Sequence, residues 1–323
     1  MHLVCGEALF DIFVDEKQSG CDVALRGVAG GSPYNVAIGL ARLGTEVALG
    51  SDIAQDAFGG LLIDQLARAG VDQRFLHRAV AATPLAIVSL SEAGAPSYSF
   101  HGLRRGAFYP ETTALKAHEG AISGIHLASI ALVLAQSGDQ LFALAQGMNK
   151  HALVSLDPNV RLSVEPDVRI WHRAIERVRP FVHLIKISEE DIRALYGRTL
   201  QPEELCESWV SDKTPLVILT KGDAGAVIFS GLAGRIDLDP INVELVDTVG
   251  AGDSFMAAFL SELVREGGLA QSSTAVQERD LLSRVGAFAV AAAALTCVAH
   301  GPAMPSRADV ETMLVHNSAH AQR

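Results

Sequence analysis

The chain lacks several features that would place it among membrane, secreted or nucleic-acid-binding proteins. Its most apolar run, residues 287–298, is shorter than the ~20 residues that a membrane span needs. The N-terminus meets Glu7 and Asp11 too early for a signal peptide. Basic residues are outnumbered, with 26 Lys and Arg against 37 Asp and Glu, and they form no block. This balance argues against nucleic acid or an anionic membrane surface as a partner.

Cysteine is also scarce and carries no motif. The cysteines are Cys5, Cys21, Cys206 and Cys297. Because no two of them have Cys-x-x-Cys spacing, neither a zinc site nor a disulfide framework is indicated, and a reducing cytoplasm fits. With 323 residues, of which 49% are hydrophobic, the chain can bury a core in one large α/β domain or two smaller ones.

Strand-like and helix-like patterns alternate from residue 125 onward. The expected strands are 125–129, 153–157, 182–187 and 216–220, and the expected helices include 138–150 and 168–178. This order predicts a parallel sheet with helices on both faces, whose ligand sites collect at the carboxyl ends of the strands. Further strands are expected at 9–14, 23–28, 85–90 and 97–100, the last two as a hairpin around residues 92–96.

One turn, residues 247–255, reads Asp-Thr-Val-Gly-Ala-Gly-Asp-Ser-Phe. An alternating run before it, residues 241–246, predicts a strand, and an apolar run from Phe255 predicts the buried face of a helix. Small residues at a helix start leave backbone N–H groups open to a phosphate, and Asp253 could accept a proton from an attacking hydroxyl. The alternative is a plain tight turn with Asp253 as a helix N-cap.

Two better-known phosphate-binding designs do not match this turn. A Rossmann fingerprint would need a third glycine where Phe255 stands, and no stretch of the chain fits a P-loop. A second glycine motif lies near the N-terminus, where residues 30–37 read Gly-Gly-Ser-Pro-Tyr-Asn-Val-Ala. It precedes an amphipathic pattern that predicts a helix, with Ser32 as N-cap and Pro33 as its first residue.

The two motifs, in this order, resemble the paired signatures of the ribokinase-like (PfkB) carbohydrate kinases. The resemblance extends from Val4 to about Met313. It implies a single α/β kinase domain over residues 1–316, a three-layer α/β/α architecture with a mainly parallel central sheet. It also implies a small β-sheet lid, drawn from about residues 9–29 and 85–101. Residues 317–323 would be a polar C-terminal tail.

The resemblance implies a sugar site made of Asp11, Gly30, Gly31, Asn35 and Arg161. In the family the aspartate of a Gly-Glu-x-x-x-Asp pattern binds sugar hydroxyls, and bare glycine backbone lets a polyol approach closely. Plainer interpretations also fit these residues. Asp11 could be a solvated carboxylate at a strand edge, Asn35 a tolerated polar residue, and Arg161 a surface charge after an Asp-Pro turn.

For the nucleotide, the resemblance implies a wall that includes Lys186, Ser188, Thr220, Gly222 and Gly225. The last three match a Thr-x-Gly-x-x-Gly pattern after a buried strand. Related kinases often carry Asn-x-x-Glu where this chain has Ser188 and a residue three positions later, Asp191. That departure leaves Asp191 with a role toward Mg²⁺ only through water.

Three further residues are singled out on the same basis. Asp247 stands where some members of the family hold a monovalent cation, so that K⁺ is a candidate, although the loop at residues 301–305 is shortened. Arg104 and Arg105 follow the expected lid and are either solvated charges or lid residues that face the sugar.

These features lead us to expect an ATP-dependent sugar kinase that uses Mg²⁺. Asp253 would act as the base toward a primary hydroxyl, and the amides of Gly250, Ala251 and Gly252 would hold the phosphoryl group. The opening residues 5–11 and the Gly-Gly-Ser-Pro-x-Asn motif resemble bacterial fructokinases most, which favours fructose as the acceptor. A 2-keto-3-deoxygluconate kinase is the alternative within the family, and the lid sheet would serve as a homodimer surface.

Two other classes stay open at this point. A non-catalytic sugar or nucleotide sensor could be built on the same fold, because fold alone does not determine function. A nicotinamide oxidoreductase is disfavoured by the missing dinucleotide fingerprint.

Overall fold

The central sheet has eight strands in the order β14-β13-β12-β11-β10-β9-β1-β4 in the computed structural model, which describes residues 1–15, 23–90, 96–103, 108–267 and 278–321. Strands β4 to β12 along this order are parallel, and β13 and β14 continue it as antiparallel strands. The strands are β14 (Gly234–Leu238), β13 (Ala226–Ser230), β12 (Leu216–Thr220), β11 (Leu184–Ser188), β10 (Leu153–Asp157), β9 (Gly124–Ala128), β1 (His2–Cys5) and β4 (Val47–Gly50). The predicted mainly parallel sheet is confirmed.

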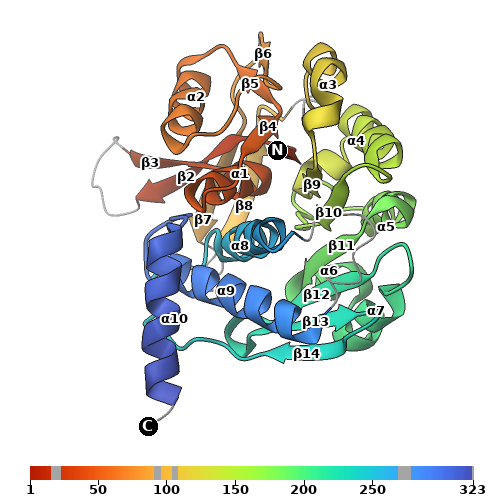
Figure 1. The fold of residues 1–323 in the computed structure, drawn as a ribbon. Helices are drawn as coiled ribbons and strands as arrows, with labels where there is room; N and C mark the ends of the chain where they lie inside the picture. Colours follow the sequence, from red (N-terminus) through yellow and green to blue (C-terminus); the bar gives the residue numbers. More distant parts are fainter. Residues whose placement is uncertain (16–22, 91–95, 104–107, 268–277, 322–323) are drawn as a thin grey trace.

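Helices cover both faces of this sheet. The helices are α1 (Ser32–Arg42), α2 (Ala57–Ala69), α3 (Thr112–His118), α4 (Ala135–Met148), α5 (Val168–Val178), α6 (Glu189–Tyr196), α7 (Pro202–Trp209), α8 (Ala251–Arg265), α9 (Arg279–Cys297) and α10 (Arg307–Ala321). Alternate strand residues point to opposite sides, so that Ile218 joins the core under α1, α8 and α9, while Val217 joins the core under α4 to α7. Figure 1 shows these three layers.

A separate four-stranded sheet has the order β3-β2-β7-β8. Its strands are β2 (Leu9–Asp15), β3 (Ala24–Gly30), β7 (Leu85–Leu90) and β8 (Pro96–His101). These are the segments from which the sequence predicts a lid, and β7 and β8 pair antiparallel as expected of a hairpin. A two-stranded sheet, β5 (Asp52–Ala54) with β6 (His77–Ala79), lies beside α2. The hairpin turn at 91–95, Arg104, Arg105 and the expected loose connection at 268–277 lie outside the described residues.

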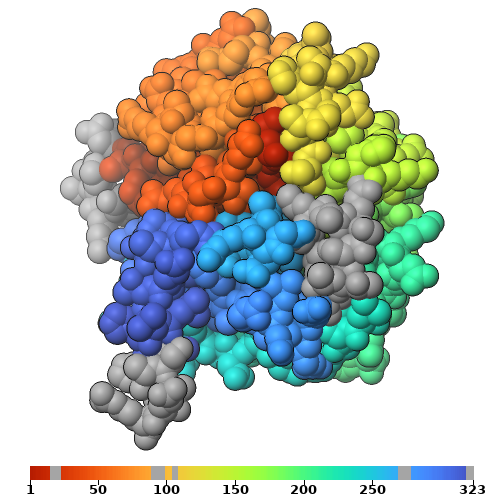
Figure 2. All heavy atoms as spheres, viewed as in Figure 1, coloured from red at the N-terminus to blue at the C-terminus, as the bar shows by residue number. Residues whose placement is uncertain are grey.

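Segments from the two ends of the chain lie side by side. Helix α1 packs against α8, and α9 packs between α8 and α10. In the space-filling view the N-terminal and C-terminal parts form one continuous surface (Figure 2). By length and composition, helix α9 could span a membrane. Most of it is buried inside the protein, however, where it packs against α8 and α10 as a core helix.

The expected strand at residues 241–246 is wrong. This segment has no regular structure, and Leu245 and Val246 are 63% and 45% exposed. It follows Pro240, which has no N–H group to donate to a neighbouring strand. The N–H groups of Val246 and Asp247 instead donate to the Cys297 carbonyl at the end of α9, at 2.9 and 3.2 Å. The turn before α8 is therefore held by a helix end rather than by a strand.

Two helix ends also differ from expectation. Gly31, not Ser32, is the N-cap of α1, and the Ser32 hydroxyl donates to the Asp253 carboxylate. At the C-terminus, α10 continues to Ala321, into residues 317–323, where a frayed polar tail was expected. Ser306 and Asp309 form reciprocal hydrogen bonds at the start of α10, the capping pattern that begins a helix.

Candidate active site

The turn before α8 places small residues at a helix start, as predicted. Gly250 is the N-cap of α8 with a φ of 82°, a conformation that glycine adopts readily. A Cβ at Gly250 would lie 2.7 Å from the Pro302 side chain, so this position also lacks room. The Ala251 N–H donates back to the Thr248 carbonyl at 3.2 Å. The N–H groups of Gly252 and Asp253 are left for a ligand, in a first turn where the helix dipole favours an anion.

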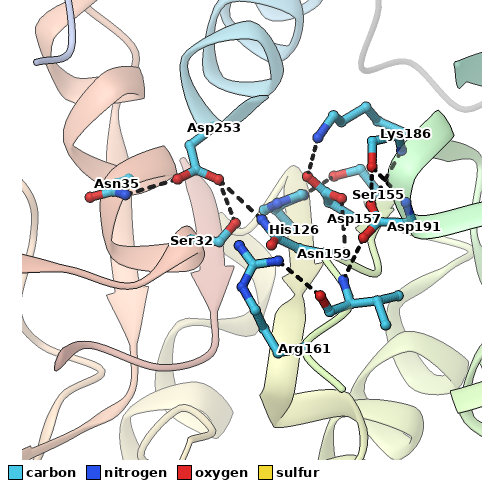
Figure 3. Close-up of polar contacts among 12 residues, drawn as sticks. Ser32, Asn35, His126, Ser155, Asp157, Asn159, Arg161, Lys186, Asp191 and Asp253 are labelled. Atoms are coloured by element: carbon cyan, nitrogen blue, oxygen red, sulfur yellow. Dashed lines mark hydrogen bonds and ion pairs between the residues drawn. The ribbon is translucent and has the colours of Figure 1, made fainter. Parts of the chain in front are cut away.

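The Asp253 carboxylate is buried and accepts hydrogen bonds from α1. Its Oδ1 accepts from the Ser32 hydroxyl at 2.6 Å, and its Oδ2 accepts from the Asn35 amide at 2.8 Å (Figure 3). The plain N-cap interpretation is therefore wrong for Asp253, since it stands inside the first turn and contacts another helix. The predicted base, Asp253, and the predicted sugar-binding residue Asn35 are therefore in direct contact, although 218 positions separate them in the sequence.

Burial is the largest influence on the acidity of Asp253 and raises its pKa. The hydrogen bonds from Ser32 and Asn35 and the charge of Lys186 lower the pKa but do not offset burial. A raised pKa makes the ionised carboxylate a stronger acceptor for the proton of an attacking hydroxyl.

Lys186 lies directly beneath the phosphate turn. Its Nζ donates to Asp157 Oδ2 at 2.7 Å, and both side chains are buried. A Cβ at Gly252 would lie 3.0 Å from this Nζ, so glycine lets the ammonium approach the turn. Burial alone lowers the pKa of Lys186, but the Asp157 carboxylate and more distant carboxylates together raise it. The lysine therefore stays charged where a phosphate would sit.

Asp191 and Ser188 form a capping box at the start of α6. Asp191 Oδ2 accepts from the Ser188 hydroxyl at 2.7 Å, and Oδ1 accepts from the Val160 N–H at 2.8 Å. Burial, followed by the nearby Asp157, raises the pKa of Asp191. Both oxygens thus have partners in the protein, and contact with Mg²⁺ through water stays a prediction. Within the described ranges, no group of three or more His, Cys, Asp or Glu residues is arranged to hold a metal.

The sugar-side residues gather around the first glycine motif. A Cβ at Gly30 would lie 2.4 Å from Asp11 Oδ2, and one at Gly31 would lie 2.7 Å from the Glu7 carbonyl oxygen. Burial raises the pKa of Asp11 to about 6 and that of Glu7 to about 7, while the charge of Arg161 opposes both shifts. Asp11 is therefore no solvated strand-edge carboxylate, since it packs onto the glycine.

The nucleotide-side residues lie at the carboxyl end of β12, next to β11 in the sheet. Gly222 and Gly225 have φ of 59° and 82°, and a Cβ at Gly225 would meet the Leu238 carbonyl at 2.2 Å. These glycines are thus explained by the turn itself, and a nucleotide contact by them or by Thr220 stays a prediction. Asp247 accepts from the N–H groups of Val249 and Gly301, at 3.0 and 2.9 Å, and its role toward a cation also stays a prediction.

Four residues contribute to this site in addition to the predicted site residues. They are Glu7, Ser32, Asp157 and Asn159. Asp157 and Asn159 belong, with Arg161, to the segment at the carboxyl end of the predicted strand 153–157, which the resemblance places beside the acceptor. Ser32 gave no usable signal, since a serine before a helix reads as a cap in the absence of tertiary contacts.

The arrangement joins a buried carboxylate, a helix N-terminus and a buried ammonium at the carboxyl edge of a mainly parallel sheet. Fold and site together define a carbohydrate kinase. The chain belongs to the pfkB family of carbohydrate kinases, whose sequence pattern matches residues 3–309. The predicted ribokinase-like relationship is confirmed.

Individual relatives agree with this assignment. A fructokinase of Escherichia coli is 30% identical over 324 residues, which cover 96% of this chain and 97% of the relative. A fructokinase of Rhizobium leguminosarum bv. trifolii is 30% identical over 288 residues, with 87% and 85% covered. The structure is similar to fructokinase from Vibrio cholerae O395 in its fructose, ADP and calcium ion bound form, with a TM-score of 0.80, 26% identity and 97% and 98% of the two chains covered. Fructokinase from Xylella fastidiosa with bound ATP has the same fold, with a TM-score of 0.84, 23% identity and 98% of each chain covered.

Proposed function

We propose that this carbohydrate kinase transfers the γ-phosphoryl group of ATP to a primary hydroxyl of fructose. The observation that carries the proposal is the meeting of the two glycine motifs at Asp253, which accepts hydrogen bonds from Ser32 and Asn35. One carboxylate thus lies at both the expected sugar site and the expected phosphate site. The relatives named above, which are fructokinases, support fructose as the acceptor.

In the proposed reaction, Asp253 accepts the proton of the sugar hydroxyl as its oxygen attacks the γ-phosphorus of ATP. A new O–P bond forms, the bond between the γ-phosphorus and the bridging oxygen breaks, and ADP leaves with that electron pair. The N–H groups of Gly252 and Asp253 and the ammonium of Lys186 stabilise the charge on the phosphoryl oxygens. Mg²⁺ carried on the phosphates would neutralise their charge, with Asp191 reached through water.

Charge around the acceptor site favours a neutral sugar. The charge of Asp253 raises the pKa of Glu7 and of Asp11 there, and the charge of Arg161 lowers both. A sugar acid would place a further negative charge beside these carboxyl groups. Glycine-lined space and carboxylate acceptors suit the hydroxyl donors of a polyol.

One observation favours the alternative acceptor, 2-keto-3-deoxygluconate. Arg161 donates to the carbonyl of Val160 at 2.9 Å but has no ion-pair partner within the part of the chain that the structure describes. A guanidinium of this kind could pair with a substrate carboxylate.

The two acceptors are separated by one experiment. Purified protein is given Mg·ATP with fructose, 2-keto-3-deoxygluconate, ribose or a nucleoside, and ADP release is measured in a coupled assay. We expect the highest kcat/KM with fructose and a large loss of turnover in the Asp253→Asn variant. A higher kcat/KM with the keto-deoxy acid would overturn the choice of fructose. Binding of sugar without turnover would indicate a sensor.

Further proposals accompany the activity. The small sheet of β2, β3, β7 and β8 is proposed as a lid over the sugar and as a homodimer surface. Residues 1–316 are proposed as a single kinase domain, and the reducing cytoplasm as its location. Asp247 is proposed as the site of a K⁺ requirement, which replacement of K⁺ by a large organic cation in the assay would reveal.

A further inference from the structure

Asn159 has a backbone conformation that L-residues rarely adopt. Its φ is 40°, and among the non-glycine residues that the structure describes only Ser129 shares a positive φ. Asn159 directly follows the Asp-Pro pair at the carboxyl end of β10. Residues held in such conformations cluster at functional sites and persist only where the surrounding structure holds them.

Buried carboxylates hold the backbone on both sides of this residue. Asp157 Oδ1 accepts from the Asn159 N–H at 3.2 Å, and Asp191 Oδ1 accepts from the next N–H, of Val160, at 2.8 Å. Asp157 is itself fixed by its ion pair with Lys186 at 2.7 Å. The strained turn is therefore anchored to the same lysine that lies under the phosphate turn.

The side chain of Asn159 points from this turn toward the base. Its Nδ2 lies 3.5 Å from Asp253 Oδ1, the oxygen that also accepts from Ser32 (Figure 3). The distance is long for a hydrogen bond, as is common in sites without substrate, where such bonds shorten when the reactants bind. Toward an ionised carboxylate, the side-chain amide of Asn159 acts as a hydrogen-bond donor. Together with Ser32 and Asn35 it gives Asp253 three donors.

We infer that Asn159 is a positioning residue, whose amide orients the Asp253 carboxylate toward the acceptor hydroxyl and links it to the Lys186–Asp157 ion pair. The inference rests on the proposed function of Asp253 as base. It explains why a strained asparagine occupies the turn, since glycine would adopt a φ of 40° without strain. The competing explanation is that asparagine simply tolerates this conformation better than other residues with a side chain.

Asn159→Gly separates the two explanations. Glycine keeps the turn and removes only the amide, so the variant should unfold at the same temperature as the wild type or higher. We expect kcat with fructose to fall roughly 10- to 100-fold, the range for losing a hydrogen bond to a charged group. The acid limb of the kcat/KM–pH profile should move to higher pH, because the carboxylate loses a donor that favours its charged form.

Asn159→Asp serves as a second variant if the glycine variant does not fold. Aspartate also tolerates the left-handed conformation, but it places a like charge beside Asp253, so that the acid limb should move to higher pH by more than in the glycine variant. Asn149→Gly, at the end of α4, is the matched control and should keep the wild-type profile. Wild-type kcat and pH profile in both Asn159 variants would overturn the inference.

A readout that needs no turnover separates this inference from the proposed function. The titration of the Asp253 carboxyl carbon is followed by NMR in ¹³C-labelled wild type and Asn159→Gly. A shift of the titration to higher pH in the variant supports the positioning role even if fructose is not the acceptor. An unchanged titration overturns it, whatever the effect on kcat.

Discussion

The two glycine motifs are alike in sequence but differ in what occupies the space above each glycine. In the first motif, a Cβ would meet oxygen atoms, Asp11 Oδ2 above Gly30 at 2.4 Å and the Glu7 carbonyl above Gly31 at 2.7 Å. In the second motif, a Cβ on Gly252 would meet the ammonium of Lys186 at 3.0 Å. The first glycine pair therefore lies against acceptor oxygens, whereas in the second motif Gly252 lies over a cation and Gly250 lies against the Pro302 side chain.

This difference divides the site by chemistry. Acceptor oxygens suit the hydroxyl donors of a sugar, whereas an ammonium and a helix N-terminus suit a phosphate. Asp253 stands at the boundary, where it belongs to the second motif and accepts hydrogen bonds from the helix that follows the first. Substitutions at each side should therefore have different consequences, and the largest should come from the shared residue.

Asp253→Asn removes the base while it keeps a side chain of the same size. We expect kcat to fall by roughly 10²–10⁴, the usual contribution of a general base, with the thermal midpoint little changed. ADP release with fructose measures the loss, and thermal unfolding checks the fold. Asp64→Asn on exposed α2 is the control for the change in charge. Near wild-type turnover in the Asp253 variant would remove the base assignment.

Lys186→Met should have the next largest effect, on both activity and stability. It leaves the Asp157 carboxylate buried without its partner, which costs about 3–5 kcal/mol of unfolding free energy. It also removes the positive charge beneath the phosphate turn, so kcat should fall as well. Urea unfolding and the kinase assay measure the two effects.

Lys221→Met is the matched stability control for this variant. Lys221 pairs with Glu203 at 2.9 Å, but both side chains are partly exposed. An exposed pair contributes less than about 1 kcal/mol. Equal losses of stability in the two variants would show that the buried pair is not special.

Regular elements were predictable wherever a local pattern had a partner in the sheet. The strand at 216–220 and the helix at 168–178 have the observed ends, because burial on one or both faces follows directly from residue period. The alternating run at 241–246 has the same local signal. It forms no hydrogen-bonded pair with a strand that the structure describes, and it stays irregular. Periodicity shows that a segment can pair, and the rest of the sheet determines whether it does.

The site was predictable in outline for a related reason. Motifs place Asp253 and Asn35 in one site through family resemblance, but their contact depends on how α1 packs against α8. The use of Ser32 depends on that packing, which leaves no mark on the residues near it in sequence. Asn159 follows a predicted strand, which places it at the edge of the site, but its approach to Asp253 depends on the order of the strands in the sheet. Long-range polar contacts are therefore the part that sequence patterns alone do not supply.

Alanine at the two glycine motifs tests the comparison directly. At Gly31, with a φ of 103° and a backbone carbonyl in the way, Gly31→Ala should destabilise the fold by about 1–3 kcal/mol. At Gly252, a helical position, an alanine Cβ meets only Nζ and Cε of the buried Lys186, which must shift slightly, so that any loss of stability should be smaller than at Gly31, below ~1 kcal/mol. The displaced ammonium should instead raise the KM for ATP. Urea unfolding and kinetics on both variants give the answer, and equal stability losses would contradict the comparison.

Glu7→Gln should have an effect on stability that depends on pH. Burial raises the pKa of Glu7 to about 7 from its ordinary value of 4.5, so the folded state binds this proton more strongly than the unfolded state. Its contribution to stability is therefore present below about pH 4.5 and is lost as pH rises through about 7. Glutamine fills the same space without a charge to desolvate, so the variant should be more stable than the wild type at pH 8, by ~1–3 kcal/mol, and should lose this advantage at pH 5.

Urea unfolding at the two pH values measures this difference, with Glu204→Gln, at an exposed residue of α7, as the control for net charge. A stability gain of the same size at both pH values would mean that the charge of Glu7 is not the cause. A gain confined to high pH would show that the fold is less stable because it keeps an acidic group against the first glycine motif. This loss of stability is expected where a carboxyl group is present to bind a ligand. A side chain retained only for stability would be uncharged at such a buried position.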